Sequence, residues 1–381
     1  NGLSFTVEAA SGAGFDEVRL VYQVAPDGVR TSAVPDCTEG AVTSCRFLLE
    51  ASERNVIIPG AEVTWFWQLT GAGMTEETEP AVVVYEDSRF QWSTITESNL
   101  TIWYYSGSED EVRAVLAAAR ESLDSISALL QVSVDFPVKI RYYASALEMQ
   151  PAILAEDRDN VITLGEVVYS DTAMVAADSA PDEIARHEIA HIVTREAVES
   201  PFALPDWLNE GTAVFAQSEP LGGQGEALDL AIQTGDVFSV RSLSSASTGA
   251  LGETVSLFYG QSWSLVDFLV TTYGEAQFAE LFGAFRDGAN TEEALEQVYG
   301  FNQDGLENAW RESVGLPPRL APTPAGDGER VPPEDAQDAS GAAADNGDGA
   351  SVVLIVAIIA LTVVLAGGAV GTAVFLARRY R

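Results

Sequence analysis

Apolar and polar residues alternate along the first part of the chain. Every second position is apolar in three stretches, which are separated by clusters of Gly, Pro, Asp and Ser: Leu3 to Val7, Val18 to Val24, and Val63 to Leu69. A period of two is typical of strands that bury one face. Several short strands of this kind predict an all-β sandwich of immunoglobulin or fibronectin type over residues 1–91. Such a domain either docks a partner or is a packed module without one.

The hydrophobic period changes after residue 91. Between two strands predicted over 100–105 and 138–143, apolar residues recur every three or four positions from 109 to 130, which is the spacing of a helix. Further helical patterns follow at 182–199, from 205 onward, and at 255–273, 275–285, 291–298 and 303–313. Strands followed mainly by helices predict an α+β domain over residues 92–316.

The pattern is lost in the last part of the chain. Pro, Gly, Ala and Asp dominate residues 317–350, and this composition predicts a disordered linker. Every residue from 352 to 377 is uncharged and most are apolar, which is a longer run than the roughly 20 residues that a helix needs to cross a bilayer. We therefore expect a C-terminal transmembrane helix over residues 351–377.

The flanks of this apolar run predict its orientation. Three arginines, Arg378, Arg379 and Arg381, follow it, and positively charged flanks stay on the cytoplasmic side. We therefore expect a single-pass cell-membrane protein with extracellular N-terminal domains and a cytoplasmic tail at 378–381. The spacing of Gly367 and Gly371 matches the GxxxG pattern, which favours a weak homodimer through the membrane helix.

Charge and cysteine content narrow the classes of function. The chain has 57 acidic and 20 basic side chains, and its net charge of -37 repels nucleic acids, so a nucleic-acid partner is excluded. Cys37 and Cys45 are the two cysteines and lie close together in a polar, turn-rich stretch. In an exported protein this arrangement predicts a local disulfide.

The candidate chemistry lies on the helix predicted at 182–199. It carries the two histidines of the chain, His187 and His191. Residues four apart on a helix project from one face, with about 40° between them, so the two imidazoles can bind one ion. The apolar positions of this helix fall on the opposite face, which predicts that the histidines point away from the core. Glu188 lies beside the pair, where it can reach a water molecule on the metal.

A catalytic zinc ion needs a third protein ligand and an open fourth position. With no third histidine in the chain, that ligand must be a carboxylate or a cysteine. The segment PDWLNEG opens a second helix at Pro205 and Asp206, and Glu210 lies in its first turns. An antiparallel arrangement of the two helices would bring this carboxylate to the ion, so Glu210 is the candidate third ligand.

The segments HEIAH and WLNEG together resemble the gluzincin pattern of zinc metallopeptidases. With a sandwich domain ahead of the peptidase, the layout is similar to the peptidase MA-like family, which includes membrane-anchored bacterial proteins. The resemblance extends over about residues 1–315 and implies a zincin-type fold for residues 92–316. It implies one zinc ion bound by His187, His191 and Glu210.

The resemblance also implies roles in catalysis. Glu188 becomes the general base that takes a proton from the attacking water and passes it to the leaving amine. Relatives use a Tyr or His to stabilise the oxyanion, and Tyr259 is the candidate here, although a role as a core aromatic residue is the alternative. The chain lacks the segment with which aminopeptidases grip a free amine, and Val214 stands where thermolysin-like enzymes have an Asp, so the residue that orients the histidines is unassigned.

Together these patterns predict a membrane-anchored, extracellular zinc metallopeptidase, of the endopeptidase type, that cleaves peptides or proteins. A strand near residues 160–171, just before the zinc helix, is expected at the edge of a sheet, where an extended peptide can add to it. The alternative is a cell-surface binding or adhesion protein on a catalytically inactive zinc-peptidase scaffold. A third possibility is that the histidines are structural and bind no metal.

Overall fold

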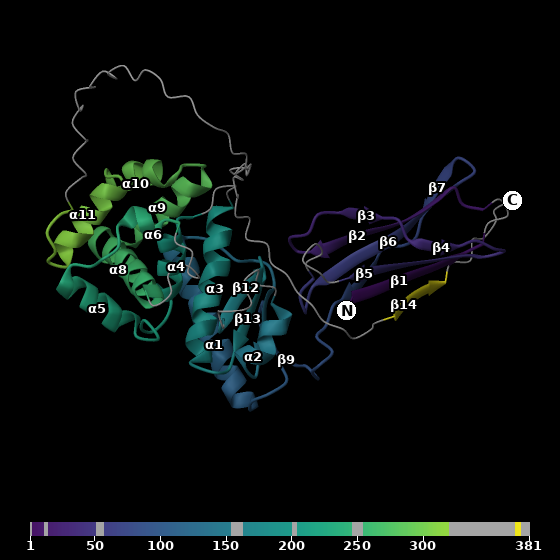
Figure 1. The fold of residues 1–381 in the computed structure, drawn as a ribbon, viewed down its shortest axis with the longest axis horizontal. Coiled ribbons are helices and arrows are strands. Elements are labelled where there is room, and N and C mark those ends of the chain that lie inside the picture. Colours follow the sequence, from purple (N-terminus) through teal and green to yellow (C-terminus); the bar gives the residue numbers. More distant parts are fainter. Residues whose placement is uncertain are drawn as a thin grey trace, which may run out of the picture.

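The computed structural model describes residues 2–10, 14–50, 57–153, 163–199, 204–245, 254–319 and 370–374. Two β-sheets formed mainly by the N-terminal residues lie at one end of the molecule (Figure 1). A third, mixed sheet follows, and the later helices gather at the other end (Figure 1). The chain is therefore multidomain, with β-sheets first and a largely helical part after them.

The two N-terminal sheets pack against each other. One has the order β14-β1-β5-β4 and the other β3-β2-β6-β7, with β8 also paired to β6. The strands are β1 (Gly2–Ala9), β2 (Glu17–Ala25), β3 (Thr31–Ala33), β4 (Asp36–Thr38), β5 (Thr43–Glu50), β6 (Glu62–Gly71), β7 (Met74–Glu77) and β8 (Ala81–Val84). As the alternation predicted, Leu3, Phe5 and Val7 are buried. The ring centroids of Phe5 and Trp65 lie 5.1 Å apart across the two sheets.

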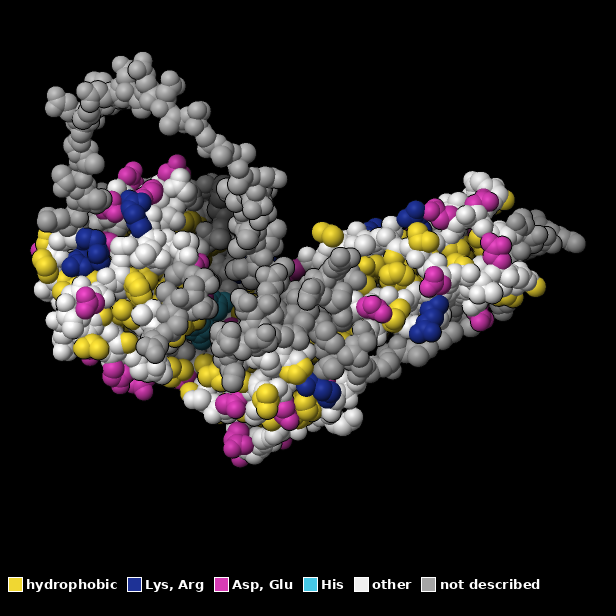
Figure 2. Space-filling view, viewed as in Figure 1, with side chains coloured by type: hydrophobic (Ala, Val, Ile, Leu, Met, Phe, Trp, Pro, Cys, Tyr) yellow, Lys and Arg dark blue, Asp and Glu magenta, His cyan; other side chains and the backbone are white. Residues whose placement is uncertain are grey.

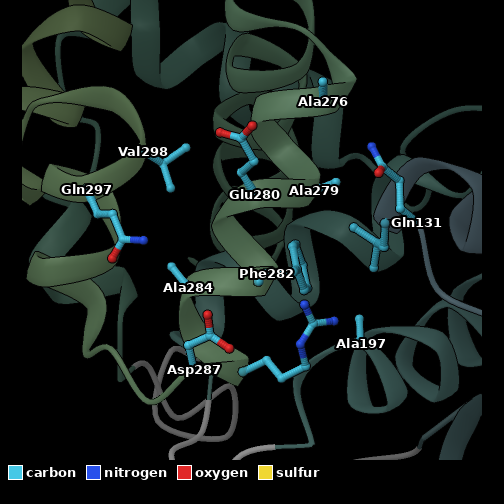
Figure 3. Close-up of a pocket in the computed structure, with 13 residues that line it drawn as sticks. Gln131, Ala197, Ala276, Ala279, Glu280, Phe282, Ala284, Asp287, Gln297 and Val298 are labelled. Carbon is cyan, nitrogen blue, oxygen red and sulfur yellow. The ribbon is translucent and has the colours of Figure 1, made fainter.

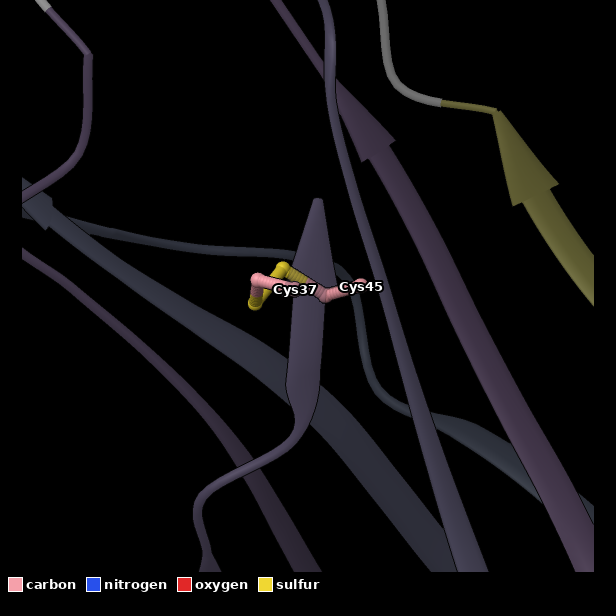
Figure 4. Close-up of a disulfide and its surroundings, with 2 residues drawn as sticks. All are labelled: Cys37 and Cys45. Carbon is pink, nitrogen blue, oxygen red and sulfur yellow. A yellow bond between two sulfur atoms is a disulfide. The ribbon is translucent and has the colours of Figure 1, made fainter. Parts of the chain in front are cut away.

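A disulfide joins two neighbouring strands of the first sheet. Cys37 in β4 lies directly opposite Cys45 in β5, and their Cα atoms are 4.1 Å apart (Figure 4). The bond ties the short strand β4, whose side chains are exposed, to a strand whose alternate side chains are buried. It therefore fixes an edge that has few apolar contacts of its own.

The third sheet has the order β12-β13-β11-β10-β9. Its strands are β9 (Ser93–Glu97), β10 (Leu100–Tyr104), β11 (Val138–Tyr143), β12 (Gly165–Tyr169) and β13 (Thr172–Ala176). The three central strands are parallel, and the edge strands β9 and β12 are antiparallel to their neighbours. Parallel strands are usually covered on both faces, and β13 accordingly has every side chain buried.

Helices cover one face of this sheet and extend beyond it (Figure 1). The long helix α1 (Glu109–Leu130) begins at a capping box formed by Ser108 and Glu111, and it packs along α3. The other helices are α2 (Ala146–Met149), α3 (Pro181–Val198), α4 (Asp206–Phe215), α5 (Gln224–Thr234), α6 (Val240–Leu243), α8 (Val255–Tyr273), α9 (Glu275–Arg286), α10 (Thr291–Tyr299) and α11 (Gln303–Ser313), with a short 3₁₀ turn at Gln150–Ala152.

The buried apolar residues form two cores, and one of them crosses the predicted boundary at residue 91. The first core lies between the third sheet and the helices. The second fills the N-terminal sandwich and continues onto the other face of the third sheet, where it includes Tyr143 and Tyr169. Arg141 is 1% exposed at this junction, between the Trp92 and Trp103 rings, and pairs with Glu86 at 2.8 Å. The two parts therefore share one buried interface.

Most of the predicted helices and strands form within a residue or two of their predicted bounds. Within residues 92–316, the helices α2, α5 and α6 and the strands β9 and β13 were not predicted. The helix α5 buries only Leu228 and Ala231, and α6 has four residues, so neither leaves a clear period in the sequence. Packing against α8, rather than local pattern, accounts for α5.

The C-terminal prediction differs from the structure at five positions. Val370–Val374, predicted as part of a transmembrane helix, forms the strand β14, parallel to β1. Val and Thr favour extended backbone, and the free edge of β1 supplies its hydrogen-bond partners. Gly371 lies in this strand, whereas Gly367, the rest of 351–377, the linker from residue 320 onward and the tail at 378–381 lie outside the described residues. Among the described helices, none is both long and apolar enough to cross a membrane.

Candidate metal centre

The helix α3 places both histidines on one side. It begins with Pro181 at its first position, followed by the acidic Asp182 and Glu183, which suit the positive end of the helix dipole. The apolar positions predicted to face the core are fully buried: Ala185, Ile189, Ile192 and Val193. The side chains of His187 and His191 keep 13% and 15% of their surface exposed. They reach the surface in a recess of the molecule (Figure 2).

The helix α4 brings Glu210 to the histidines. It packs on both α3 and α8. A Cβ atom added to Gly211 would lie 2.3 Å from the carbonyl oxygen of Ser262 in α8, so only glycine allows this close approach of the two helices. Because Gly211 directly follows Glu210, the close contact of Gly211 with α8 also sets the position of the Glu210 carboxylate.

The three side chains form a compact set of ligand atoms. The His187 Nε2 and His191 Nε2 atoms are 3.1 Å apart, and Glu210 Oε2 lies 3.3 Å from the first and 3.5 Å from the second. Ligands at about 2.0–2.1 Å around a tetrahedral zinc ion are roughly 3.3–3.4 Å from one another. Within the described ranges this is the one group of three or more potential metal ligands. The donor set and its spacing therefore fit zinc.

The electrostatics of the three groups favour a bound cation. Burial opposes ionisation of Glu210, but the neighbouring histidines outweigh it and hold the pKa of that carboxyl well below its usual range. Burial also opposes the charge on His191, yet Glu210 raises the pKa of His191 to about 9. A carboxylate held among imidazoles in a buried site attracts positive charge, whether this is a proton or a metal ion.

Asn209 orients one of the ligands and was not predicted from the sequence. Its Oδ1 lies 3.1 Å from His191 Nδ1 and also accepts a hydrogen bond of 3.3 Å from the Thr194 hydroxyl. Because an amide oxygen can only accept, His191 Nδ1 carries the proton and Nε2 is left free for the metal. The signal was present in the sequence, since Asn209 directly precedes the ligand Glu210.

Glu188 lies between the zinc helix and the edge strand β12. It is 6% exposed and accepts a hydrogen bond from the backbone N–H of Val167. Burial raises the pKa of Glu188 to about 8. A Cβ atom on Gly165 would lie 2.6 Å from the Glu188 carboxylate, so the strand passes directly over this side chain. The strand expected at the sheet edge is thus β12, next to the candidate general base.

Tyr259 in α8 reaches the same site. Its ring centroid lies 6.1 Å from that of His187. Burial raises the pKa of Tyr259 well above its usual value, and the carboxylates of Glu210 and Glu188 raise it further, so the phenol stays protonated and can donate a hydrogen bond. The predicted site residues, His187, Glu188, His191, Glu210 and Tyr259, therefore lie in one place, whereas Cys37 and Cys45 belong to the N-terminal sheets.

A separate pocket of about 570 Å³ lies away from this centre (Figure 3). It is lined by the ends of α1 and α3 and by α9 and α10, and its polar side chains include Gln131, Glu280, Asp287 and Gln297 (Figure 3). None of the metal-centre side chains lines it. The pocket is therefore not part of the candidate site.

Comparison with known proteins places the chain in a family. The model of the Peptidase MA superfamily matches residues 118–315, just over half of the chain and the part that holds the metal centre. The chain belongs to the Peptidase MA superfamily. This membership confirms the predicted gluzincin relationship and the zinc cofactor that it implies. No curated protein matches the chain.

Solved structures show a looser similarity. An M1 zinc metallopeptidase from Deinococcus radiodurans matches at 16% identity with a TM-score of 0.38. A two-domain M1 zinc metallopeptidase mutant bound to L-arginine matches at 15% identity with a TM-score of 0.39. Each match covers 84% of this chain, which spans 66% of the length of the other.

Replacing Asn209 tests its role beside the metal. We expect Asn209→Ala to weaken zinc binding about 10- to 100-fold, because the His191 ring loses the acceptor that fixes its proton and its orientation. Asn209→Asp keeps an acceptor at this position and should retain zinc. Competition with a chelator measures both affinities, and an unchanged affinity in the alanine variant would exclude the role.

Proposed function

We propose that the protein is a zinc-dependent endopeptidase that cleaves extended peptide segments. The observation that carries the proposal is that three ligand atoms lie within 3.5 Å of one another. The buried carboxylate of Glu188 lies on the helix that carries the two histidines. Three protein ligands leave a fourth position of a tetrahedral ion for water, which is the arrangement of catalytic rather than structural zinc.

The side chains divide the chemistry among them. Zinc supplies Lewis-acid activation of water and of the scissile carbonyl group. Glu188 accepts a proton from the attacking water at its carboxylate and passes it to the leaving amine. The Tyr259 hydroxyl donates a hydrogen bond to the oxygen on which negative charge develops. Asn209 holds His191 in the tautomer that this geometry requires.

The edge strand β12 is the proposed docking place for the substrate. It pairs with β13 on one side only, among the described strands, and runs beside Glu188. An extended peptide that adds to this edge has its backbone held by main-chain hydrogen bonds, which do not require a free terminus. This mode of binding, together with the lack of an amine-gripping segment in the sequence, favours an endopeptidase over an aminopeptidase.

In this proposal the peptidase works outside a membrane, to which residues 351–377 anchor it. The uncharged run from 352 to 377, the arginines after it and the disulfide support this location. A membrane helix and the pairing of Val370–Val374 with β1 exclude one another. Membrane extraction therefore distinguishes the two arrangements.

Replacing Glu188 tests the proposed activity. We expect Glu188→Gln to lower kcat for cleavage of an unfolded protein about 10²- to 10⁴-fold, because glutamine cannot take up the proton, while zinc is retained. Glu196→Gln, near the C-terminal end of α3, is the matched control and should cleave at the wild-type rate. Wild-type protein that binds zinc but cleaves nothing in a broad peptide library would instead favour the adhesion alternative.

Replacing Tyr259 tests its role at the oxyanion. Loss of one oxyanion donor costs about 10²- to 10³-fold in kcat, so we expect a decrease of this size for Tyr259→Phe with little change in KM or zinc content. Tyr273→Phe is the control on the same helix, where the ring packs against Tyr299 with centroids 5.0 Å apart. A kcat equal to the wild type would assign Tyr259 to packing alone.

Extraction tests the membrane anchor. When the full chain is produced behind an export signal, we expect it to sediment with membranes, to remain there in alkaline carbonate and to dissolve in detergent. The reason is that an apolar helix leaves the bilayer only when detergent replaces the surrounding lipid. A chain that ends at residue 350 should be soluble. Full-length protein released by carbonate would contradict the anchor and favour the strand at Val370–Val374.

A further inference from the structure

The edge strand β12 is held by the N-terminal domain as well as by its own sheet. The backbone N–H of Ile58 donates a buried hydrogen bond of 2.9 Å to the hydroxyl of Tyr169, the last residue of β12. The next residue, Ser170, donates its backbone N–H to the Asp27 carboxylate at 2.7 Å. Asp27 also lies 3.6 Å from the guanidinium of Arg195 in the zinc helix. These contacts join the N-terminal domain to both elements of the site.

The first residues of the same strand contact Glu188, the proposed general base. Gly165 packs on Glu188, and the N–H of Val167 donates to the Glu188 carboxylate. The pairing of β12 with β13 shifts register between Val167 and Tyr169, so the ladder is interrupted there. Three paired residues, Gly165 to Val167, lie on one side of this shift, and Tyr169 is the one paired residue of β12 on the other side. A short edge strand with an interrupted ladder needs further contacts to keep one position.

We propose that the N-terminal domain sets the position of the substrate-binding edge strand, with Tyr169 and Asp27 as positioning residues. Neither touches the reacting atoms. Both act through the backbone of β12, whose edge is unpaired among the described strands and must be fixed before an extended peptide can pair with it. The inference rests on the proposed function and gives the N-terminal domain a part in substrate binding rather than in docking a separate partner.

A purely structural role is the alternative, and the interface contains a matched control for it. The Tyr143 hydroxyl makes a buried hydrogen bond of 3.2 Å with Asp87, which precedes the third sheet in the chain. Tyr143 lies in the central strand β11, which has a partner strand on each side. Tyr143→Phe therefore removes one buried hydrogen bond of a tyrosine hydroxyl, which here donates to a carboxylate, without releasing an edge strand.

Hydrogen exchange of the full chain without substrate tests the proposal directly. In Tyr169→Phe we expect the amides of residues 164–170 to exchange about tenfold faster than in the wild type, the change expected for loss of one buried hydrogen bond. Tyr143→Phe should leave exchange in this segment unchanged. Equal exchange of the segment in the wild type and Tyr169→Phe, or equal acceleration in both variants, would overturn the proposal.

Kinetics supply a second readout. We expect Tyr169→Phe to raise KM for a long peptide at least threefold, with kcat within twofold of the wild type and zinc content unchanged. If Tyr169→Phe fails to fold, Asp27→Ala, at an exposed contact, replaces it in both measurements. The exchange result does not depend on catalysis, so a protein without peptidase activity would contradict the proposed function while the positioning of β12 is still decided.

Discussion

Holding one carboxylate and two imidazole nitrogens within 3.5 Å of one another is the constraint on which the rest of the structure depends. Such a cluster is stable inside a protein only when a positive charge lies among the three groups. The local structure is arranged to keep the groups together. The four-residue spacing in α3 aligns the histidines, Gly211 lets α4 approach α8, and Asn209 fixes the ring of His191.

The sequence predicts those parts of the site that follow from local periodicity. The pairing of His187 with His191 depends only on the helical repeat, and Glu210 follows from the need for a third ligand on a neighbouring helix. The role of Asn209 was not predicted because it depends on which side of α4 faces the His191 ring, and this is set by the packing of α4. The interface around Arg141 was not predicted for a similar reason, since Arg141 and Glu86 are more than fifty positions apart in the sequence.

That interface changes the view of the N-terminal domain. Alternating strands predict a sandwich, but they contain no sign that its core continues onto the third sheet through Tyr143 and Tyr169. Long-range contacts of this kind leave no period in the sequence. They make the sandwich a support for the peptidase sheet. Most helices cover one face, the N-terminal domain and α2 lie against the other, and β12 is an edge strand among the described strands, beside Glu188.

The zinc content of the purified protein tests the central claim most directly. The metal content is measured in three proteins prepared identically: the wild type, Glu210→Ala and the exposed control Glu219→Ala. The comparison shows whether zinc is lost when the third ligand is removed. We expect one zinc ion per chain in the wild type and the control, and little in Glu210→Ala, because two histidines alone hold zinc weakly. A wild type without zinc after zinc is supplied at neutral pH, or a Glu210→Ala variant that keeps a full equivalent, would contradict the account.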